Sequence, residues 1–297
     1  MRTPLSEGRS GGAWRIGVIG GSGLYDLTAL DDVQVIDVAS PFGTPSGPVT
    51  LGTIAGVQFA FLPRHGAGHR IAPEAINYRA NIDVLKRCGV TDLLAISAIG
   101  SLREEYAPGS FVAVDQFIDR TTGRVGSFFG EGLVTHVSLA DPVCPRLSAL
   151  AASAAERAGK TVHRGGCYLA MQGPQFSTRA ESRMYRQWGA DVIGMTAMPE
   201  ARLAREAELP YALLGMVTDY DSWREGEHVE VEDVLKVMHA NSSAARDTVA
   251  HLAALLPSTR EASPIDTALD GAIMTAAPLR DPVLAARLDA IAGRVLG

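Results

Sequence analysis

Apolar runs of strand length alternate along this chain with longer stretches in which apolar residues recur every three or four positions. The runs predict strands at 15–20, as a hairpin within 49–63, at 92–97, and near 110–115, 162–170, 190–194 and 211–217. The helical spacing predicts helices from Pro73 to about Gly89 and near 145–158, 178–187, 199–207 and 231–255. Because residues 92–97 lack polar alternation, we expect a sheet that is covered on both faces. The pattern indicates an α/β fold with a central, mostly parallel or mixed β-sheet flanked by helices.

The same pattern indicates one domain with additions at both ends. Residues 1–13 are polar and glycine-rich and are expected to form a disordered leader, whereas residues 14–257 carry the alternating elements. Residues 258–297 are expected to form a linker and a C-terminal helical extension, with its helix near 281–294. The composition, 46% hydrophobic and 20% charged, is that of an ordinary globular protein with an ample core.

Charge and cysteine usage narrow the classes of partner. The net charge is −6 and no run of Lys or Arg occurs, so no nucleic-acid partner is expected. The chain holds no uninterrupted apolar stretch of about 18 residues, so no membrane partner is expected either. The N-terminus lacks the apolar core of a signal peptide, and the three cysteines show no CxxC spacing. We therefore expect a cytoplasmic protein that acts on small molecules.

The most informative stretch is 214–223, where an apolar run ends in Thr218, Asp219 and Asp221. Carboxylates at the carboxyl end of a strand are costly to bury unless they have a partner or a task. The two aspartates would share a face if the strand stayed extended. A purine base, with its ring and exocyclic nitrogens, is one partner that would suit them.

Candidate anion-binding residues follow other predicted strands. They are Ser22 in a glycine-rich turn, the pair Arg64 and His65, Ser97 with Ala98, and Thr196. Glycines let the backbone approach an anion, and the arginine fork suits phosphate oxygens. Each segment taken alone is also consistent with an ordinary turn. The spacing of His65 and His69 resembles a metal motif, but no carboxylate or thiol pattern supports one, and no metal is expected.

Two further residues near these segments have both a structural and a functional interpretation. Phe176 precedes a predicted helix capped by Ser177 or Thr178, and it either stacks on a flat ring or staples the helix. Met195 is either a core residue or a soft contact beneath a sugar. Because open α/β sheets build sites at the carboxyl ends of their strands, we expect one anion pocket beside one carboxylate pocket.

Taken in order, several segments resemble the trimeric purine nucleoside phosphorylase family, and most closely its methylthioadenosine-cleaving branch. The resembling segments are Ile16–Leu24, Leu62–Gly66, Asn77–Asn81, Ile99–Arg103, Asp115–Thr121, Gly173–Ser177, Arg179–Ser182, Trp188–Asp191 and Thr218–Asp221. Ser22 and Ser97 stand where the eukaryotic branch has threonine, so the hydroxyl is kept. No GxGxxG pattern can be drawn through the first glycine cluster, which disfavours a dinucleotide-binding protein.

The resemblance implies a nine-stranded phosphorylase fold. It implies phosphorolysis of 5′-methylthioadenosine, with inversion at C1′, to adenine and 5-methylthioribose 1-phosphate in purine and methionine salvage. Inorganic phosphate would be a co-substrate, and no cofactor is expected. By motif position the phosphate would be bound by Ser22, Arg64, His65, Ser97, Ala98 and Thr196. The nucleoside would be bound by Phe176, Ser177, Met195, Thr218, Asp219, Asp221, Val234, Leu235 and, from a neighbouring subunit, His136. The borrowed histidine implies a homotrimer with a site shared between subunits.

Within this resemblance, Asp219 and Asp221 are the candidate catalytic residues. The leaving purine gathers negative charge, and protonation at N7 disperses it. Asp219 is the candidate general acid, and we expect burial and the nearby Asp221 to raise its pKa above the reference value of about 3.9. An aspartate at 219 favours a 6-amino purine. The alternatives are a phosphorylase for 6-oxopurine nucleosides or methylthioinosine and, in a different class, a non-catalytic nucleotide-binding or dinucleotide-binding protein.

Overall fold

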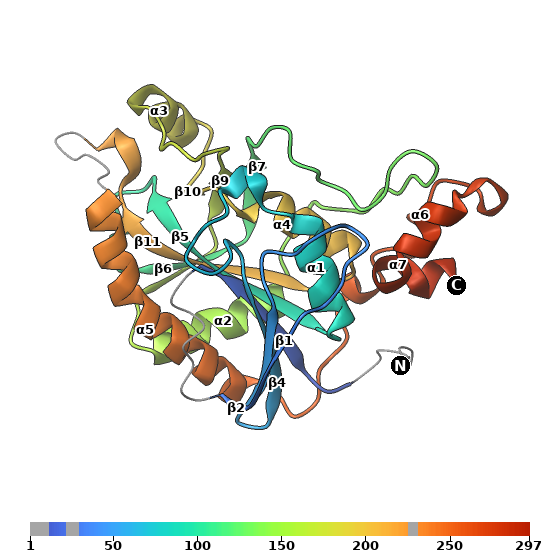
Figure 1. Cartoon of the computed structure of the whole chain (residues 1–297). Coiled ribbons are helices and arrows are strands. Elements are labelled where there is room, and N and C mark those ends of the chain that lie inside the picture. The colour runs from blue at the N-terminus through green and yellow to red at the C-terminus, as the bar shows by residue number, and fades with distance from the viewer. Residues whose placement is uncertain (1–11, 22–29, 225–230) are drawn as a thin grey trace.

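The computed structural model describes residues 12–21, 30–224 and 231–297, without the side chains of residues 231, 233–235 and 238–240. The predicted site residue Ser22 and the side chains of Val234 and Leu235 therefore lie outside the described residues. Of the leader expected over residues 1–13, only Gly12 and Ala13 are described. Figure 1 shows a central sheet with helices on both sides.

The elements confirm the predicted α/β class. The strands are β1 (Arg15–Gly20), β2 (Asp31–Ile36), β3 (Val49–Ile54), β4 (Val57–Pro63), β5 (Asp92–Ser101), β6 (Phe111–Val114), β7 (Gln116–Asp119), β8 (Val162–Arg164), β9 (Cys167–Ala170), β10 (Val192–Gly194) and β11 (Tyr211–Asp219). The helices are α1 (Tyr78–Arg87), α2 (Pro145–Arg157), α3 (Arg179–Gln187), α4 (Ala197–Glu206), α5 (Val231–Leu255), α6 (Pro282–Arg287) and α7 (Asp289–Leu296). Short 3₁₀ turns lie at Pro73–Ala75, Asp221–Trp223, Pro264–Thr267 and Ala277–Leu279.

The described strands form one mixed sheet of eleven strands, in the order β2-β3-β4-β1-β5-β10-β9-β7, with β11 joined to β5 and followed by β6 and β8. The pairs β1–β4, β1–β5 and β5–β11 are parallel, whereas β3–β4 and β5–β10 are antiparallel. The expectation of nine strands is therefore corrected. The apolar pattern missed β2 and β7, which have no fully buried side chain, and it placed β8 and β9 in one segment near 162–170.

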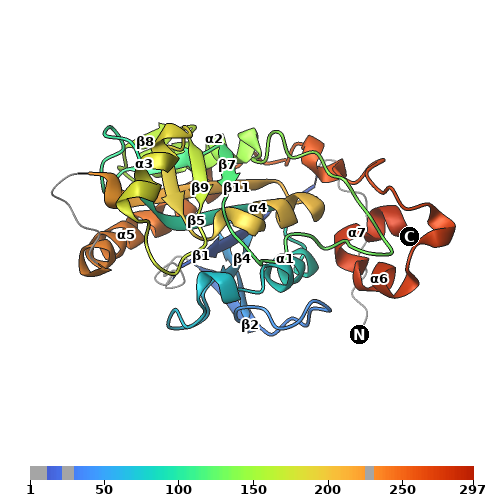
Figure 2. The same cartoon turned by 90° about the horizontal axis from the view of Figure 1, so that it is seen from above.

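Both faces of the central strands are covered. Leu93 and Ala95 of β5 pack in a core shared with α1, α4 and α7, whereas Leu94 and Ile96 pack with α2 and α5. Alternate residues of a strand point to opposite faces, so one continuous apolar run supplies two cores. Figure 1 shows α2 and α5 on one side of the sheet and α1 and α4 on the other, and Figure 2 gives the view from above, in which α4 lies across the strands.

Two predicted boundaries are wrong. Pro73 opens a 3₁₀ turn rather than a helix, and α1 begins at Tyr78, because the side chain of Asn77 caps it by accepting from the Ala80 N–H at 3.1 Å. The segment from Ser97 to Ser101, expected to follow a strand, is the second half of β5. Pairing with β10 and β11 keeps this small and hydroxyl-bearing segment extended.

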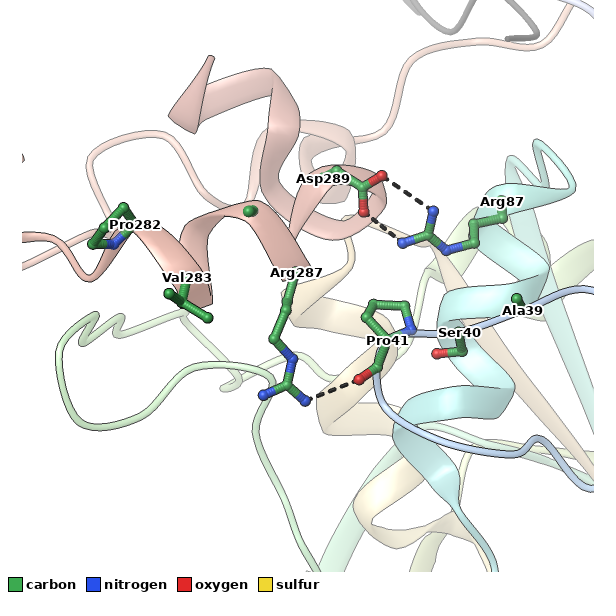
Figure 3. A pocket seen from close by; sticks show the side chains of 9 residues that line it. Ala39, Ser40, Pro41, Arg87, Pro282, Val283, Arg287 and Asp289 are labelled. Carbon is green, nitrogen blue, oxygen red and sulfur yellow. Dashed lines mark hydrogen bonds and ion pairs between the residues drawn. The ribbon is translucent and has the colours of Figure 1, made fainter. Parts of the chain in front are cut away.

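The C-terminal residues pack against the domain through charged side chains as well as through the apolar residues of α7. Arg260 is 2% exposed and pairs with Asp92 at the start of β5 as well as with Asp266. A groove of about 770 Å³ lies between α1 and the α6–α7 segment. Figure 3 shows the side chains that line it. Its walls are joined by the ion pair of Arg87 with Asp289 and by a bond from Arg287 to the carbonyl of Pro41. The C-terminal extension therefore contacts the rest of the domain along this groove.

In the part of the chain that the structure describes, no helix is long and apolar enough to cross a membrane. No group of three or more His, Cys, Asp and Glu side chains gathers there in a way that could hold a metal ion.

Candidate active site

A cavity of about 480 Å³ opens near the ends of β1, β5, β10 and β11, and its size is typical of a small-molecule site. Arg64 and His65 border one part of it, and Asp219 and Asp221 border another. The rest of its wall is formed by Gly21, His69, Pro73, Ser97, Ala98, Ile99, Gly100, Met171, Pro174, Phe176, Ile193, Gly194, Met195, Thr196, Met216, Thr218 and Ser242. The predicted anion-binding residues and the predicted carboxylates therefore share one pocket.

Arg64, which directly follows β4, is held by a buried carboxylate. Its Nε and Nη2 donate to the two carboxylate oxygens of Glu200 at 2.8 and 3.0 Å, and both side chains are 1% exposed. Its Nη1 and Nη2 also donate to the carbonyls of Ile96 and Ile19 at 3.0 and 3.1 Å. The hydroxyl of Tyr211 donates to Glu200 at 3.0 Å. These bonds fix the plane of the guanidinium at the edge of the cavity.

His65 is neutral at pH 7. Burial and the neighbouring charge of Arg64 outweigh the bond to Ile71 and lower the pKa of His65 to about 4. Its Nδ1 lies 2.9 Å from the carbonyl oxygen of Ile71, so Nδ1 carries the hydrogen and Nε2 is an acceptor. The ring of His69 stacks on it with centroids 4.0 Å apart, and burial lowers the pKa of His69 as well.

Two hydroxyls complete the polar end of the cavity. The Oγ of Ser97 and the Oγ1 of Thr196 lie 3.4 Å apart, which brings the middle of β5 beside the end of β10. The Thr196 N–H points to the hydroxyl oxygen of Tyr168 at 3.4 Å. An arginine beside two hydroxyls is a donor set that suits an anion such as phosphate.

The strand that carries the carboxylates does not stay extended. β11 ends at Asp219, and Asp221 begins a 3₁₀ turn with a φ of 50°. Asp219 accepts from the Thr218 hydroxyl at 2.6 Å and from the Asp221 N–H at 2.9 Å. Gly100 of β5 leaves room for this turn, since a Cβ there would lie 3.1 Å from Oδ2 of Asp219. A turn, and not the predicted extended strand, brings the two carboxyl groups to one cavity.

Burial raises the pKa of both aspartates. For Asp219 the bonds from Thr218 and from the backbone of Asp221 act in the opposite direction. For Asp221 burial raises the pKa to about 6; the Ser182 hydroxyl opposes this rise and the charge of Asp219 adds to it. Contrary to expectation, Asp221 acts on Asp219 through an N–H that favours the ionised form. Both carboxyl groups therefore keep a proton to a higher pH than an exposed aspartate does.

The remaining predicted residues divide into two groups. Met195 and Phe176 line the cavity, and the phenyl group is 41% exposed. Ser177 does not line it, because its hydroxyl is turned to Sδ of Met171 at 3.6 Å. The helix cap is Thr178, whose side chain accepts from the Glu181 N–H.

His136 lies away from the cavity of its own chain. It is exposed, and its N–H donates to the carbonyl of Ala272 at 2.9 Å, beside a β-bridge between Thr135 and Ile273. A role for His136 in the site of a neighbouring subunit stays a prediction, as do the roles of Ser22, Val234 and Leu235.

Sequence reasoning missed several contributors to the site. Glu200 looks in the sequence like an ordinary acidic residue in the first turn of a helix, and nothing local marks it as the partner of Arg64. Ser242, which lines the cavity, follows Leu235 by seven residues. Residues seven apart share one face of a helix, so this spacing was a usable signal for Ser242.

Comparison with known proteins identifies relatives over almost the whole chain. Residues 15–254 match the family described as the phosphorylase superfamily. A Cereibacter sphaeroides protein named S-methyl-5′-thioadenosine phosphorylase is 58% identical over 285 residues, which cover 95% of this chain and 98% of that protein. A Geobacter sulfurreducens protein of the same name is 49% identical over 280 residues, covering 94% of this chain and 98% of that protein.

Solved structures agree with these relatives. A methylthioadenosine phosphorylase from an antarctic soil metagenomic library superposes with a TM-score of 0.89 and 43% identity, covering 94% of this chain and 99% of the other. The methylthioadenosine phosphorylase of Schistosoma mansoni, solved in complex with adenine, gives a TM-score of 0.78 and 39% identity, covering 82% and 91%.

Proposed function

The chain belongs to the phosphorylase superfamily, among relatives named S-methyl-5′-thioadenosine phosphorylase, and from this premise we propose the reaction that it catalyses. It cleaves the N-glycosidic bond of 5′-methylthioadenosine with inorganic phosphate, giving adenine and 5-methylthioribose 1-phosphate, and is thus a pentosyltransferase. The observation that carries this proposal is that Arg64 and Asp219 border the same cavity. A phosphate and a purine can therefore be held at opposite ends of one sugar.

The phosphate is bound at the polar end, by Arg64, His65, Ser97, Ala98 and Thr196 together with Ser22. Support comes from the guanidinium that Glu200 holds at the cavity edge and from the paired hydroxyls of Ser97 and Thr196. Since the Nδ1–H of His65 is bound to a carbonyl, its Nε2 accepts the P–OH hydrogen of hydrogen phosphate. An unprotonated phosphate oxygen is then left for C1′.

The nucleoside lies between that phosphate and the carboxyl pair. Met195 contacts the ribose, and Phe176 and Thr218 surround the base, with Ser177 behind Met171 of the same wall. Asp219 accepts from the 6-amino group in its ionised form, which the bonds from Thr218 and the Asp221 backbone favour, although burial, the larger effect, raises its pKa. Asp221, whose pKa burial raises to about 6, holds the proton that the pair passes to N7. Asp219 and Asp221 thus act as one titrating unit, not as a single acid.

In the reaction the C1′–N9 bond breaks, its electron pair stays on the purine, and the sugar becomes cation-like. The bound phosphate stabilises that cation and forms the new C1′–O bond on the opposite face, so C1′ is inverted. The carboxyl pair gives its proton to N7, hydrogen phosphate releases its own proton to solvent on becoming an ester, and the carboxyl pair regains a proton from solvent. Loss of such an acid lowers the rate by roughly 10²–10⁴-fold.

The substituent at C5′ is bound by Val234 and Leu235, with His136 from a neighbouring subunit, in a homotrimer. Support for the shared site is that His136 is exposed on its own chain. It lies on a segment that is bonded to Ala272 and Ile273 of the C-terminal extension. Each buried CH₂-sized group adds only about 0.8 kcal/mol to the preference for methylthio over hydroxyl. We place the enzyme in the cytoplasm, where it serves purine and methionine salvage; its three free cysteines support this compartment.

The experiment that tests the proposal is adenine release from methylthioadenosine, measured with and without phosphate beside methylthioinosine, adenosine and inosine. We expect release that requires phosphate and is fastest with methylthioadenosine. Faster cleavage of the 6-oxo nucleosides would favour the alternative substrate class. Absence of any phosphate-dependent release would show a binding protein. Light scattering on the same sample is expected to give a trimer, and a fully active monomer would remove His136 from the site.

A further inference from the structure

Arg124 lies between two walls of the active-site cavity without lining the cavity itself. It follows β7 on the segment that leads towards α2, and its side chain is partly buried. Neither the sequence patterns nor the resemblance assigned it a role.

The guanidinium of Arg124 donates to backbone groups of two separate segments. Its Nη1 donates to the carbonyls of Met195 and Met198 at 2.6 and 2.8 Å, and its Nη2 donates to the carbonyl of Gln172 at 2.7 Å. The nearby Thr122 N–H donates to the side-chain oxygen of Gln172 at 2.9 Å, which strengthens the second attachment. One side chain therefore joins the segment that runs from β10 into α4 to a segment that follows β9.

These two segments carry different parts of the proposed substrate. The first holds Met195 and Thr196, which the proposed function places at the ribose and the phosphate. The second continues from Gln172 to Pro174 and Phe176, which line the cavity at the base. Movement of either wall is thus transmitted to the other through a single planar group.

A third attachment reaches the loop that follows the phosphate residues. Nη1 of Arg124, whose two hydrogens are shared among three acceptors, also lies 3.0 Å from the hydroxyl of Tyr78, which in turn donates to the carbonyl of Pro73 at 2.8 Å. Pro73 lines the cavity. The guanidinium thus binds three sides of the pocket from outside the cavity. Its donors lie in a fixed planar fork, which an ammonium group does not have.

We propose that Arg124 is a positioning residue that couples the phosphate end of the site to the purine end. Bound phosphate orders the Met195–Thr196 wall, and Arg124 carries that order to the wall beside the base, so each ligand tightens the binding of the other. The proposal rests on the proposed function for the identity of the two ligands. It differs from a purely structural role, which would lower stability but leave the mutual effect of the ligands unchanged.

The test is a binding experiment on the purified full chain. The probe is a C-nucleoside analogue of methylthioadenosine, in which a carbon–carbon bond replaces the cleavable bond, titrated with and without saturating inorganic phosphate. In the wild type, phosphate is expected to lower the Kd of the analogue by roughly fivefold or more, the ordinary range of coupling between sites. In Arg124→Lys, the ratio of the Kd without phosphate to the Kd with phosphate is expected to fall to within about twofold of one.

The matched control is Arg202→Lys. Arg202 lies on α4 in the same region and pairs with Asp119 at 3.1 Å, but it is 44% exposed and joins no two walls of the cavity. We expect phosphate to lower the Kd of the analogue in Arg202→Lys by the same factor as in the wild type. A wild type without the effect, an unchanged ratio in Arg124→Lys, or an equal loss in Arg202→Lys would each overturn the proposal.

If Arg124→Lys does not yield folded protein, Tyr78→Phe replaces it, because this change removes only the hydroxyl that accepts from Arg124. In Tyr78→Phe, the ratio of the Kd without phosphate to the Kd with phosphate is expected to fall by about twofold. An unchanged ratio would equally overturn the proposal. Adenine release by the wild type is measured separately. Loss of that activity would refute the proposed function, whereas an active wild type with an intact ratio in Arg124→Lys would refute only the role of Arg124.

Discussion

The buried ion pair of Arg64 and Glu200 allows a quantitative prediction about how the phosphate end of the site is held. Both side chains are 1% exposed, and they share two bonds of 2.8 and 3.0 Å. The perturbation is a double-mutant cycle that changes each residue to methionine, alone and together. Methionine is unbranched and flexible, as arginine and glutamate are, and brings no charge.

The structure sets the expected magnitudes. Removal of one partner leaves the other charge buried and uncompensated, which costs about 3–5 kcal/mol of unfolding free energy. Each single variant should therefore lose a large part of a total stability of about 5–15 kcal/mol. In the double variant no charge is left buried without a partner, so this cost in unfolding free energy disappears. The orphaned carbonyls of Ile96 and Ile19 and the hydroxyl of Tyr211 then cost about 1 kcal/mol each, roughly 3 kcal/mol in sum.

The assay is urea unfolding of the four proteins, followed by the phosphate KM of those that fold. The two single variants together should lose about 6–10 kcal/mol of unfolding free energy, and the double variant about 3 kcal/mol. The coupling energy between Arg64 and Glu200 should therefore be at least about 3 kcal/mol. The double variant should fold, yet lose phosphate-dependent activity, because Arg64 is gone. A surface pair of the same residue types, Arg164 with Glu156 at 2.8 Å and 47% and 45% exposed, provides the control.

Methionine substitutions at that exposed pair should give a coupling energy of no more than about 1 kcal/mol. If the buried pair gave an equally small value, the argument from burial would be refuted. If the double variant kept its phosphate KM, Arg64 would not belong to the phosphate site.

Asp219→Asn should shift the ratio of catalytic efficiencies from methylthioadenosine towards methylthioinosine, because an amide can donate to a 6-oxo group; an unchanged ratio would contradict the assignment of Asp219 to the base. For the pH dependence, the active form is the one that carries the proton, so activity is complete below the pKa and is lost above it. Since burial raises the pKa of Asp221 to about 6, kcat/KM for the nucleoside at saturating phosphate should decline above that pH, by about tenfold per unit. Asp221→Asn should lack this decline, and identical profiles in the two proteins would remove Asp221 from the proton path.

Some parts of this protein were predictable because their signal is local. The long helix α5 has the bounds that its apolar spacing predicted, and the buried strand β5 begins where its apolar run begins. Residues at the ends of several strands were expected to meet, because the carboxyl ends of parallel strands lie at one edge of a sheet. Arg64 and Asp219 do meet there, whereas Thr196 follows β10, which runs antiparallel to β5 and reaches the same cavity from the opposite direction.

Other parts carried no local signal. The strand β2 has almost no buried side chain, so its pairing with β3 leaves no apolar pattern in the sequence. Glu200 is separated from Arg64 by 136 residues, and Arg124 is separated from Met195 by 71. Partners at such distances are chosen by the packing of whole elements.

The sequence by itself determined the alternation of strands and helices, the residue types that suit an anion and a purine, and the resemblance to a family. Burial pattern and side-chain chemistry are properties of short segments, and short segments can be read directly. Only the tertiary structure decided which carboxylate opposes Arg64, that a turn and not an extended strand aims Asp221 at the cavity, and that one guanidinium braces its walls. Each of these depends on backbone positions that distant elements impose on one another when they pack.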